Sequence, residues 1–284
     1  MPSIVTLDIF SGLPNPTWVL SDEQVRELQQ LLSKGPTTSP IGSLPLLGYR
    51  GFVVRPIESS TTPSTRLEGA TESAAGAGDA VVSHSPDAEE FLLRTAASAI
   101  DEDLQRHVQD VIASGPAPEV LRQMEAATTV SCPSCNAADA PAYNPGYWNT
   151  PARQPNNNCY NYANDQATNT FAQPGRATGR PITALSCAGV QPSATSDGLR
   201  ACGNFSGQLG TGQGWYVALV IWPGRDYHWY RQDKVGCWSH KPGSTPARNT
   251  DNSGNAITDP RTCNRGNYTI FCTYMITTRK VTIR

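Results

Sequence analysis

The sequence is poor in charge: 16% of its 284 residues are Asp, Glu, Lys or Arg, where globular domains typically have about 25%. It has no run of about 20 apolar residues, which excludes a membrane-spanning helix. Its first residues, MPSIVTLDIFSGLPNP, lack a basic start followed by an apolar stretch, so we expect no secretory signal. That favours the cytoplasm or leaderless export, whereas the composition favours an extracellular protein, so the compartment stays open.

Glutamate is absent from the second part of the chain, and histidine is scarce throughout. Residues 1–125 hold 17 acidic and 8 basic residues, a net charge of −9, and residues 126–284 hold 7 acidic and 14 basic residues, a net charge of +7. The second part also holds all eight cysteines. This contrast predicts two domains, 1–125 and 126–284. The opposite charges predict that the acidic domain docks on the basic one and regulates access to it. The basic residues are scattered rather than clustered with aromatics, so we expect no nucleic-acid partner.

Hydrophobic patterning predicts that residues 1–125 form a small α+β domain. Ser21 and Gln24 have the spacing of a capping box, which starts a helix that ends at Gly35. Pro86 opens a long amphipathic helix. It carries apolar residues at a spacing of four: Ile100, Leu104, Val108 and Ile112. Strands are predicted at IVTLDIF, GYRGFVV and DAVVS, a mobile loop over 58–78, and a shorter helix over 117–126.

Residues 126–284 read mainly as β-structure with one clear helix, which begins at Cys159. The predicted strands are 215–222, 228–233, 236–240 and 268–278, separated by turn sequences such as Pro223-Gly224. One helix followed by an antiparallel sheet is again an α+β arrangement.

Cys159 stands in the stretch QPNNNCYNYANDQ, directly after a good helix-capping residue, Asn158. This places Cys159 in the first turn of a helix, where unpaired N–H groups and the helix dipole favour a thiolate. A thiolate nucleophile needs a general base, which is usually histidine. The second domain has only two histidines, His228 and His240.

The two histidines lie twelve residues apart in DYHWYRQDKVGCWSH, on the two strands of a predicted hairpin. A three-residue loop places the even-numbered positions of both strands on one face and makes the imidazoles neighbours. A two-residue loop places them on opposite faces. Gly236 suits the left-handed position of a three-residue loop with a bulge, so we favour that register.

Cysteine at a helix start, histidine opening one strand and a polar residue on the next resemble the papain-like superfamily of cysteine hydrolases, in its NlpC-type or CHAP-type branch. The resemblance covers roughly residues 155–245 and is one of order and spacing. Asn158-Cys159-Tyr160 stands where those enzymes usually have Asp-Cys-Ser or Asp-Cys-Gly. The stretches HWYRQD, WSHKPG and DNSGNAITDP also resemble an uncharacterised microbial family.

The resemblance implies a hydrolase that cleaves the amide bond of a peptide or cell-wall substrate through a thioester, without a cofactor. Cys159 would be the nucleophile, His228 its base, and His240 the group that orients the base. Asp251 or Asn252 are alternatives for the third group. Oxyanion donors would be the N–H of Cys159 and a side-chain amide from Gln154 or Asn158.

The same residues allow a second reading, a disulfide-stapled binding or toxin module without catalysis. Eight cysteines permit four disulfides, which would include Cys159. Cys132 and Cys135 have zinc-knuckle spacing but lack a second pair of ligands, so we expect no metal site. One tryptophan, Trp229 or Trp238, would line a substrate cleft while the others form the core. Four basic residues are expected to lie on the solvated surface or, as a set, to bind an anionic group of the substrate: Arg225, Arg231, Lys241 and Arg248.

Overall fold

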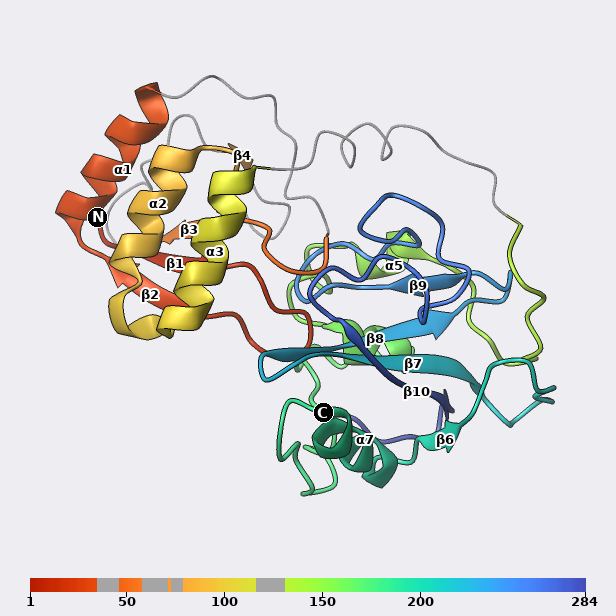
Figure 1. Cartoon of the computed structure of the whole chain (residues 1–284). Helices are drawn as coiled ribbons and strands as arrows, with labels where there is room; N and C mark the ends of the chain where they lie inside the picture. The colour runs from red at the N-terminus through yellow and green to blue at the C-terminus, as the bar shows by residue number, and fades with distance from the viewer. Residues whose placement is uncertain (35–45, 58–70, 73–78, 116–130) are drawn as a thin grey trace. The chain divides into compact units, whose positions relative to one another are not determined.

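The computed structural model of the protein describes residues 1–34, 46–57, 71–72, 79–115 and 131–284 (Figure 1). The chain has an α+β fold, as expected, and divides into two compact units. The first unit comprises Met1–Ile9, Asn15–Leu44 and Tyr49–Pro118. The second comprises Phe10–Pro14, Pro45–Gly48 and Glu119–Arg284. The charge pattern predicts a boundary at residue 125, but it gives no sign that two short early segments belong to the second unit.

The first unit contains an antiparallel sheet with the strand order β2-β1-β3-β5-β4. Side chains of β1 alternate between buried and more accessible positions, the pattern of a sheet with one face in the core. The strand β2 was not anticipated, because its four residues follow a proline-rich turn. The strands are β1 (Ser3–Leu7), β2 (Thr17–Leu20), β3 (Phe52–Pro56), β4 (Thr71–Glu72) and β5 (Ala80–Val82).

In the part of the first unit that the structure describes, the helices are α1 (Asp22–Lys34), α2 (Pro86–Thr95) and α3 (Glu102–Ser114), with a 3₁₀ helix over Ala97–Ala99. The predicted capping box forms, since Gln24 N–H donates to Ser21 Oγ and Ser21 N–H donates to Gln24 Oε1. The single long helix expected after Pro86 is wrong. Asp101 caps a new helix by accepting from Leu104 N–H at 2.9 Å, so the segment divides into α2 and α3. The expectations for residues 58–70, 73–78 and 117–126 fall outside the described residues.

The second unit contains a five-stranded antiparallel sheet with the order β6-β10-β7-β8-β9. All four predicted strands are confirmed to within three residues. The fifth, β6, is a three-residue edge strand that the sequence pattern did not indicate. The strands are β6 (Arg200–Cys202), β7 (Trp215–Trp222), β8 (Asp226–Gln232), β9 (Trp238–His240) and β10 (Ile270–Thr277).

The β8–β9 hairpin has the predicted register. Tyr230 pairs with His240, and Asp233 N–H donates to Cys237 O at 2.9 Å, which leaves a three-residue loop. Gly236 in that loop has a φ of +93°, a conformation that favours glycine. The register puts His228 and His240 on the same face of the sheet.

Among the described residues of the second unit, the helices are α5 (Pro145–Trp148), α6 (Cys159–Ala163) and α7 (Cys187–Ser196). The first seven residues of β7 are all buried, which requires that both faces of the sheet are covered. The side chains of Trp229 and Trp238 are accordingly both fully buried, on opposite faces. None of the helices in the described ranges has both the length and the apolar character needed to cross a lipid bilayer.

Candidate functional site

The helix α6 begins where the sequence predicts, with Asn158 as its cap and Cys159 as its first residue. Asn158 Oδ1 accepts hydrogen bonds from the N–H groups of Tyr160 at 3.0 Å and Asn161 at 3.1 Å. Asn161 Oδ1 in turn accepts from Asn158 N–H at 3.2 Å. This reciprocal pair satisfies the first N–H groups of the helix and fixes the position of Cys159.

Cys159 is a free cysteine, and its side chain has no exposed surface. The backbone N–H groups of Trp229 and of Cys159 itself point at Sγ and stabilise the thiolate, as does the nearby charge of Lys241. Burial outweighs these effects and, with the negative charge of Asp226, raises the pKa of the thiol well above its usual value. The expectation of a thiolate stabilised by the helix start is therefore wrong for this closed arrangement, in which the sulfur is a neutral thiol.

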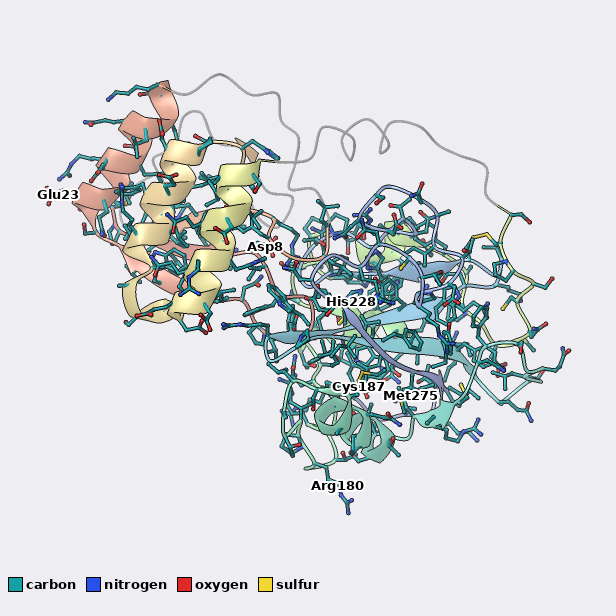
Figure 2. The ribbon with its side chains drawn as sticks, viewed as in Figure 1. Asp8, Glu23, Arg180, Cys187, His228 and Met275 are labelled. Atoms are coloured by element: carbon teal, nitrogen blue, oxygen red, sulfur yellow. A yellow bond between two sulfur atoms is a disulfide. The ribbon has the colours of Figure 1, made fainter. Side chains whose placement is uncertain are left out.

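The two imidazoles of the β8–β9 hairpin are in direct contact, as the favoured register predicts. His228 Nε2 lies 2.8 Å from His240 Nδ1, and His240 Nε2 lies 3.0 Å from the carbonyl oxygen of Thr250. Figure 2 labels His228 among the side chains of the second unit. Burial and the neighbouring charge of Arg248 lower the pKa of His240 to about 3, so its ring is neutral at ordinary pH.

These contacts determine where the protons sit. A carbonyl oxygen only accepts, so His240 Nε2 carries the proton and donates to Thr250. The neutral ring of His240 then has its lone pair on Nδ1, and His228 Nε2 must donate to it. In neutral His228 the lone pair consequently lies on Nδ1, the form that a general base requires.

Cys159 approaches β8 at the residue that follows His228. Its helix packs on the face of the sheet that carries Trp229, whose ring centroid lies 5.4 Å from that of Tyr160. The His228 ring lies on the other face, with Tyr230 and His240. Sγ is bound to the backbone of β8 itself, next to the peptide that joins His228 to Trp229. The structure thus places the Cys159 thiol and the His228 ring on opposite faces of β8, and a thiol–imidazole hydrogen bond stays a prediction.

The three predicted accessory residues have different outcomes. Asn158 Nδ2 donates to the carbonyl oxygen of Gly12 at 2.9 Å, so its amide does bind a carbonyl group next to Cys159. Gln154 takes part in the site through its main-chain carbonyl oxygen, which accepts a hydrogen bond from Lys241 Nζ at 2.6 Å. The expectation that Trp229 lines an open cleft is wrong, because the ring is fully buried under α6.

Lys241 is a positioning residue that sequence reasoning assigned to the surface. Its ammonium group is buried and donates to the carbonyl oxygens of Gln154, Asn157 and Gly243. Two of these carbonyls belong to the turn that leads into Cys159. Arg231 and Arg248 are also buried rather than solvated. The only signal for Lys241 is its place directly after His240.

Asp226, the first residue of β8, is a second site residue that sequence reasoning missed. Its carboxylate is buried and accepts hydrogen bonds from the backbone N–H groups of the segment Phe10–Pro14 and from the Tyr268 hydroxyl. Burial raises the pKa of Asp226. No sequence pattern links residues about 215 positions apart, such as Ser11 and Asp226.

The alternative third groups organise a loop instead. Asp251 accepts from the N–H groups of Ser253 and Asn255. The side chain of Asn252 binds both the N–H and the carbonyl oxygen of Leu47. The group in contact with His228 is therefore His240.

Four of the eight cysteines form two disulfides, Cys132–Cys237 and Cys187–Cys272. The other four are free: Cys135, Cys159, Cys202 and Cys263. The four disulfides that the alternative reading allows do not form, and Cys132, the first residue of the zinc-knuckle spacing, contributes one half of a distant disulfide. Among the described residues, no group of three or more His, Cys, Asp or Glu side chains is placed to hold a metal ion.

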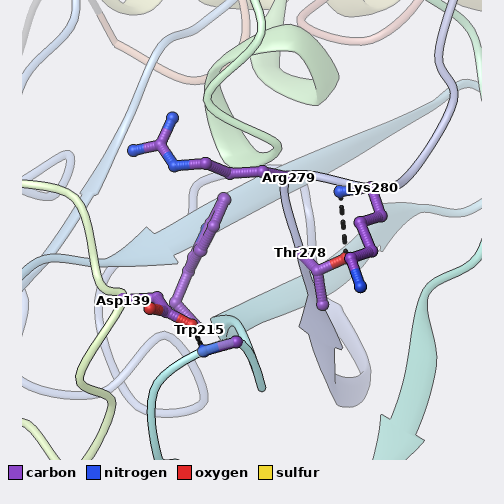
Figure 3. Close-up of a pocket in the computed structure, with 6 residues that line it drawn as sticks. Asp139, Trp215, Thr278, Arg279 and Lys280 are labelled. Atoms are coloured by element: carbon purple, nitrogen blue, oxygen red, sulfur yellow. Dashed lines mark hydrogen bonds between the residues drawn. The ribbon is translucent and has the colours of Figure 1, made fainter.

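A cavity of about 130 Å³ lies elsewhere on the second unit (Figure 3). It is lined by Asp139, Gly212, Trp215, Thr278, Arg279 and Lys280. Within this lining, the Asp139 carboxylate accepts hydrogen bonds from the N–H groups of Gly212 and Gly214. None of the predicted site residues lines this cavity.

Comparison with known proteins gives a match to part of the chain. Over 129 residues the chain is 50% identical to insoluble matrix shell protein 1 of Ruditapes philippinarum, which is 45% of this chain and 84% of that protein. No family model matches the sequence. No solved structure matches it either.

Proposed function

The chain belongs to the same family as insoluble matrix shell protein 1, and we propose that its second unit holds a cysteine hydrolase site of the papain-like kind, closed in this structure. The observation that carries the proposal is the ordered His228–His240 pair at 2.8 Å, on a hairpin whose other face packs against the helix that begins with the free Cys159. In a catalytic triad one residue acts as the general base and a second residue orients it, and a histidine pair with one fixed proton arrangement supplies both. The resemblance in order and spacing over residues 155–245 points the same way.

The chemistry would proceed in two steps once the site is open to water and substrate and the His228 ring, which lies on the other face of β8 in this structure, has reached the thiol. His228 Nδ1 takes the proton of the Cys159 thiol, and the sulfur forms a bond to the carbonyl carbon of an amide. The Asn158 side-chain amide and the N–H of Cys159 donate to the oxyanion. The C–N bond then breaks, and His228 returns the proton to the leaving amine. Water, deprotonated by His228, then attacks the thioester carbon; the C–S bond breaks, the acid is released and His228 returns the proton to the sulfur.

Alkylation tests the proposal directly. The native protein is treated with iodoacetamide at pH 6, the modified residue is mapped, and the hydrolysis of peptide and cell-wall amides is measured in parallel. We expect slow but selective modification of Cys159 and hydrolysis that is lost in Cys159→Ser. In His228→Ala we expect kcat to fall by about 10³-fold or more, because the base is missing. Free Cys202, which is half-buried, is the internal control for unselective labelling. Hydrolysis that is equal in wild type and Cys159→Ser would refute the proposal.

A second candidate is a non-catalytic structural or binding module, stapled by disulfides. It is supported by the complete burial of Cys159, His228 and His240 and by the name of the relative, which describes a matrix protein. In that case Cys159 resists iodoacetamide in the folded protein under all conditions, and its replacement by Ser changes stability but no activity.

A further inference from the structure

We propose that the segment Phe10–Pro14 occupies the substrate side of the Cys159 site, and that the site takes a bent peptide with glycine at the position of Gly12. This inference rests on the proposed function and names its substrate class. The segment belongs to the second unit, and it contacts the start of β8 and the cap of α6.

The carbonyl group of Gly12 is held by side chains around Cys159. Its oxygen accepts hydrogen bonds from Asn158 Nδ2 at 2.9 Å and from Gln173 Nε2 at 2.8 Å. The hydroxyl of Tyr227, which donates to Gln173 Oε1 at 2.8 Å, lies 3.3 Å from the same oxygen. Asn158 precedes the proposed nucleophile, so this is the amide donor that an oxyanion site requires.

The N–H groups of the segment are recognised as well. Asp226 accepts from Ser11 N–H at 2.5 Å, Gly12 N–H at 3.1 Å and Leu13 N–H at 2.9 Å. Gly243 N–H donates to Ser11 O at 3.1 Å. Residues 11–13 form a bend, in which consecutive N–H groups converge on one carboxylate, so these contacts read the main chain of the bend and not its side chains.

One position is selective for glycine. A Cβ atom on Gly12 would lie 2.5 Å from the Tyr227 ring and 2.6 Å from the Tyr227 carbonyl oxygen. The ring is fully buried, and the carbonyl is part of β8, so neither gives way readily. A side chain at this position is therefore excluded, and a competing peptide needs glycine there.

The segment also explains why the site is closed. It places protein atoms where a substrate carbonyl would bind, and water is kept from the thiol. A substrate with the same main-chain pattern has to displace it. Replacing Gly12 should weaken the binding of the segment to the site, and it leaves the proposed catalytic residues Cys159, His228 and His240 unchanged.

The test compares Gly12→Ala with Gly203→Ala, an exposed glycine that has no neighbouring atom within 4 Å of an added Cβ. Two quantities are measured: the rate of Cys159 alkylation by iodoacetamide, and hydrogen exchange of the Ser11, Gly12 and Leu13 amides. We expect Gly12→Ala to raise both by about tenfold or more, the factor for roughly 1.4 kcal/mol, and Gly203→Ala to change neither. Retention of both disulfides and an unchanged circular dichroism spectrum show that the variant is folded. Unchanged alkylation and exchange in folded Gly12→Ala would overturn the inference.

A peptide added in trans tests the glycine requirement. The pentapeptide Phe-Ser-Gly-Leu-Pro, which copies residues 10–14, should restore the protection of Cys159 in Gly12→Ala. The same peptide with Ala in place of Gly should not, and equal protection by both would overturn the specificity. The outcome is separable from the proposed function: if Gly12→Ala exposes Cys159 and no amide is hydrolysed, the hydrolase fails and the occupied peptide site stands.

Discussion

At the scale of the residue, the ionisation of His240 is strongly shifted by its surroundings. Burial and the charge of Arg248 lower its pKa from 6.5 to about 3. In the unfolded chain the ring takes up a proton near pH 6.5, whereas in the folded chain it does so only near pH 3. Between these values the unfolded state binds more protons, so the stability that the neutral ring contributes is complete above pH 6.5 and is lost as the pH falls.

We therefore expect the free energy of unfolding to fall by about 1.4 kcal/mol for each pH unit below 6, from this group alone. Urea unfolding at pH 7, 6 and 5 measures the slope. His240→Asn should lower stability at pH 7, because the hydrogen bond with His228 is altered, but should remove this part of the slope. An identical slope in the variant would show that His240 does not remain neutral in the folded protein.

At the scale of the element, the start of α6 is positioned from two sides. Asn158 caps the helix from within, by a local pattern that the sequence displays. Lys241, just beyond β9, holds the preceding turn through the carbonyl oxygens of Gln154 and Asn157. A buried ammonium group that donates to three carbonyls replaces water for all of them.

Lys241→Met keeps most of the side chain's volume but leaves three buried carbonyl oxygens without this donor. We expect a loss of about 2–4 kcal/mol in the free energy of unfolding, measured by urea denaturation. Lys234→Met is the matched control, since Lys234 is exposed in the β8–β9 loop, and it should change stability by less than about 0.5 kcal/mol. A similar small effect at both positions would contradict the clamping role of Lys241.

At the scale of the whole molecule, two disulfides join distant parts of the second unit. Their cysteines are separated by 105 residues for Cys132–Cys237 and by 85 for Cys187–Cys272. Cys187 opens α7 and Cys272 lies in β10, so the second disulfide ties that helix to the sheet (Figure 2). Disulfides that close long loops restrict the unfolded chain most, and they are typical of oxidising compartments.

Replacing both Cys187 and Cys272 with Ala should lower the free energy of unfolding by about 2–5 kcal/mol. Thermal and urea unfolding measure the loss. Cys202→Ala, at a free and half-buried cysteine, should cost clearly less. If reductant lowers the melting temperature of the double variant as much as that of the wild type, this disulfide is not the one that stabilises the unit.

The predicted docking of the acidic domain on the basic one stays a prediction at this scale. Deleting residues 1–125 removes the acidic residues and the segment Phe10–Pro14 together. A gain of activity in that truncation would therefore not distinguish electrostatic docking from release of the segment. Gly12→Ala, which leaves every charge in place, separates the two.

Local features of this protein follow from its sequence. The register of the β8–β9 hairpin depends on loop length and on Gly236, and the start of α6 depends on Asn158 and its neighbours, all within a few residues. The contact between His228 and His240 could therefore be predicted from these short stretches of sequence. The division of the helical segment at Asp101 was also encoded locally, by a capping residue that the spacing of apolar residues concealed.

Only the tertiary structure decided the state of the site. The burial of Lys241, the pairing of the cysteines and the docking of Phe10–Pro14 on Asp226 all join residues far apart in the chain, for which sequence carries no periodic signal. The charge state of Cys159 also depended on them, because a helix start favours the thiolate only where water or a positive charge reaches it. Packing removed the water, and desolvation then outweighed the local preference that the sequence expresses.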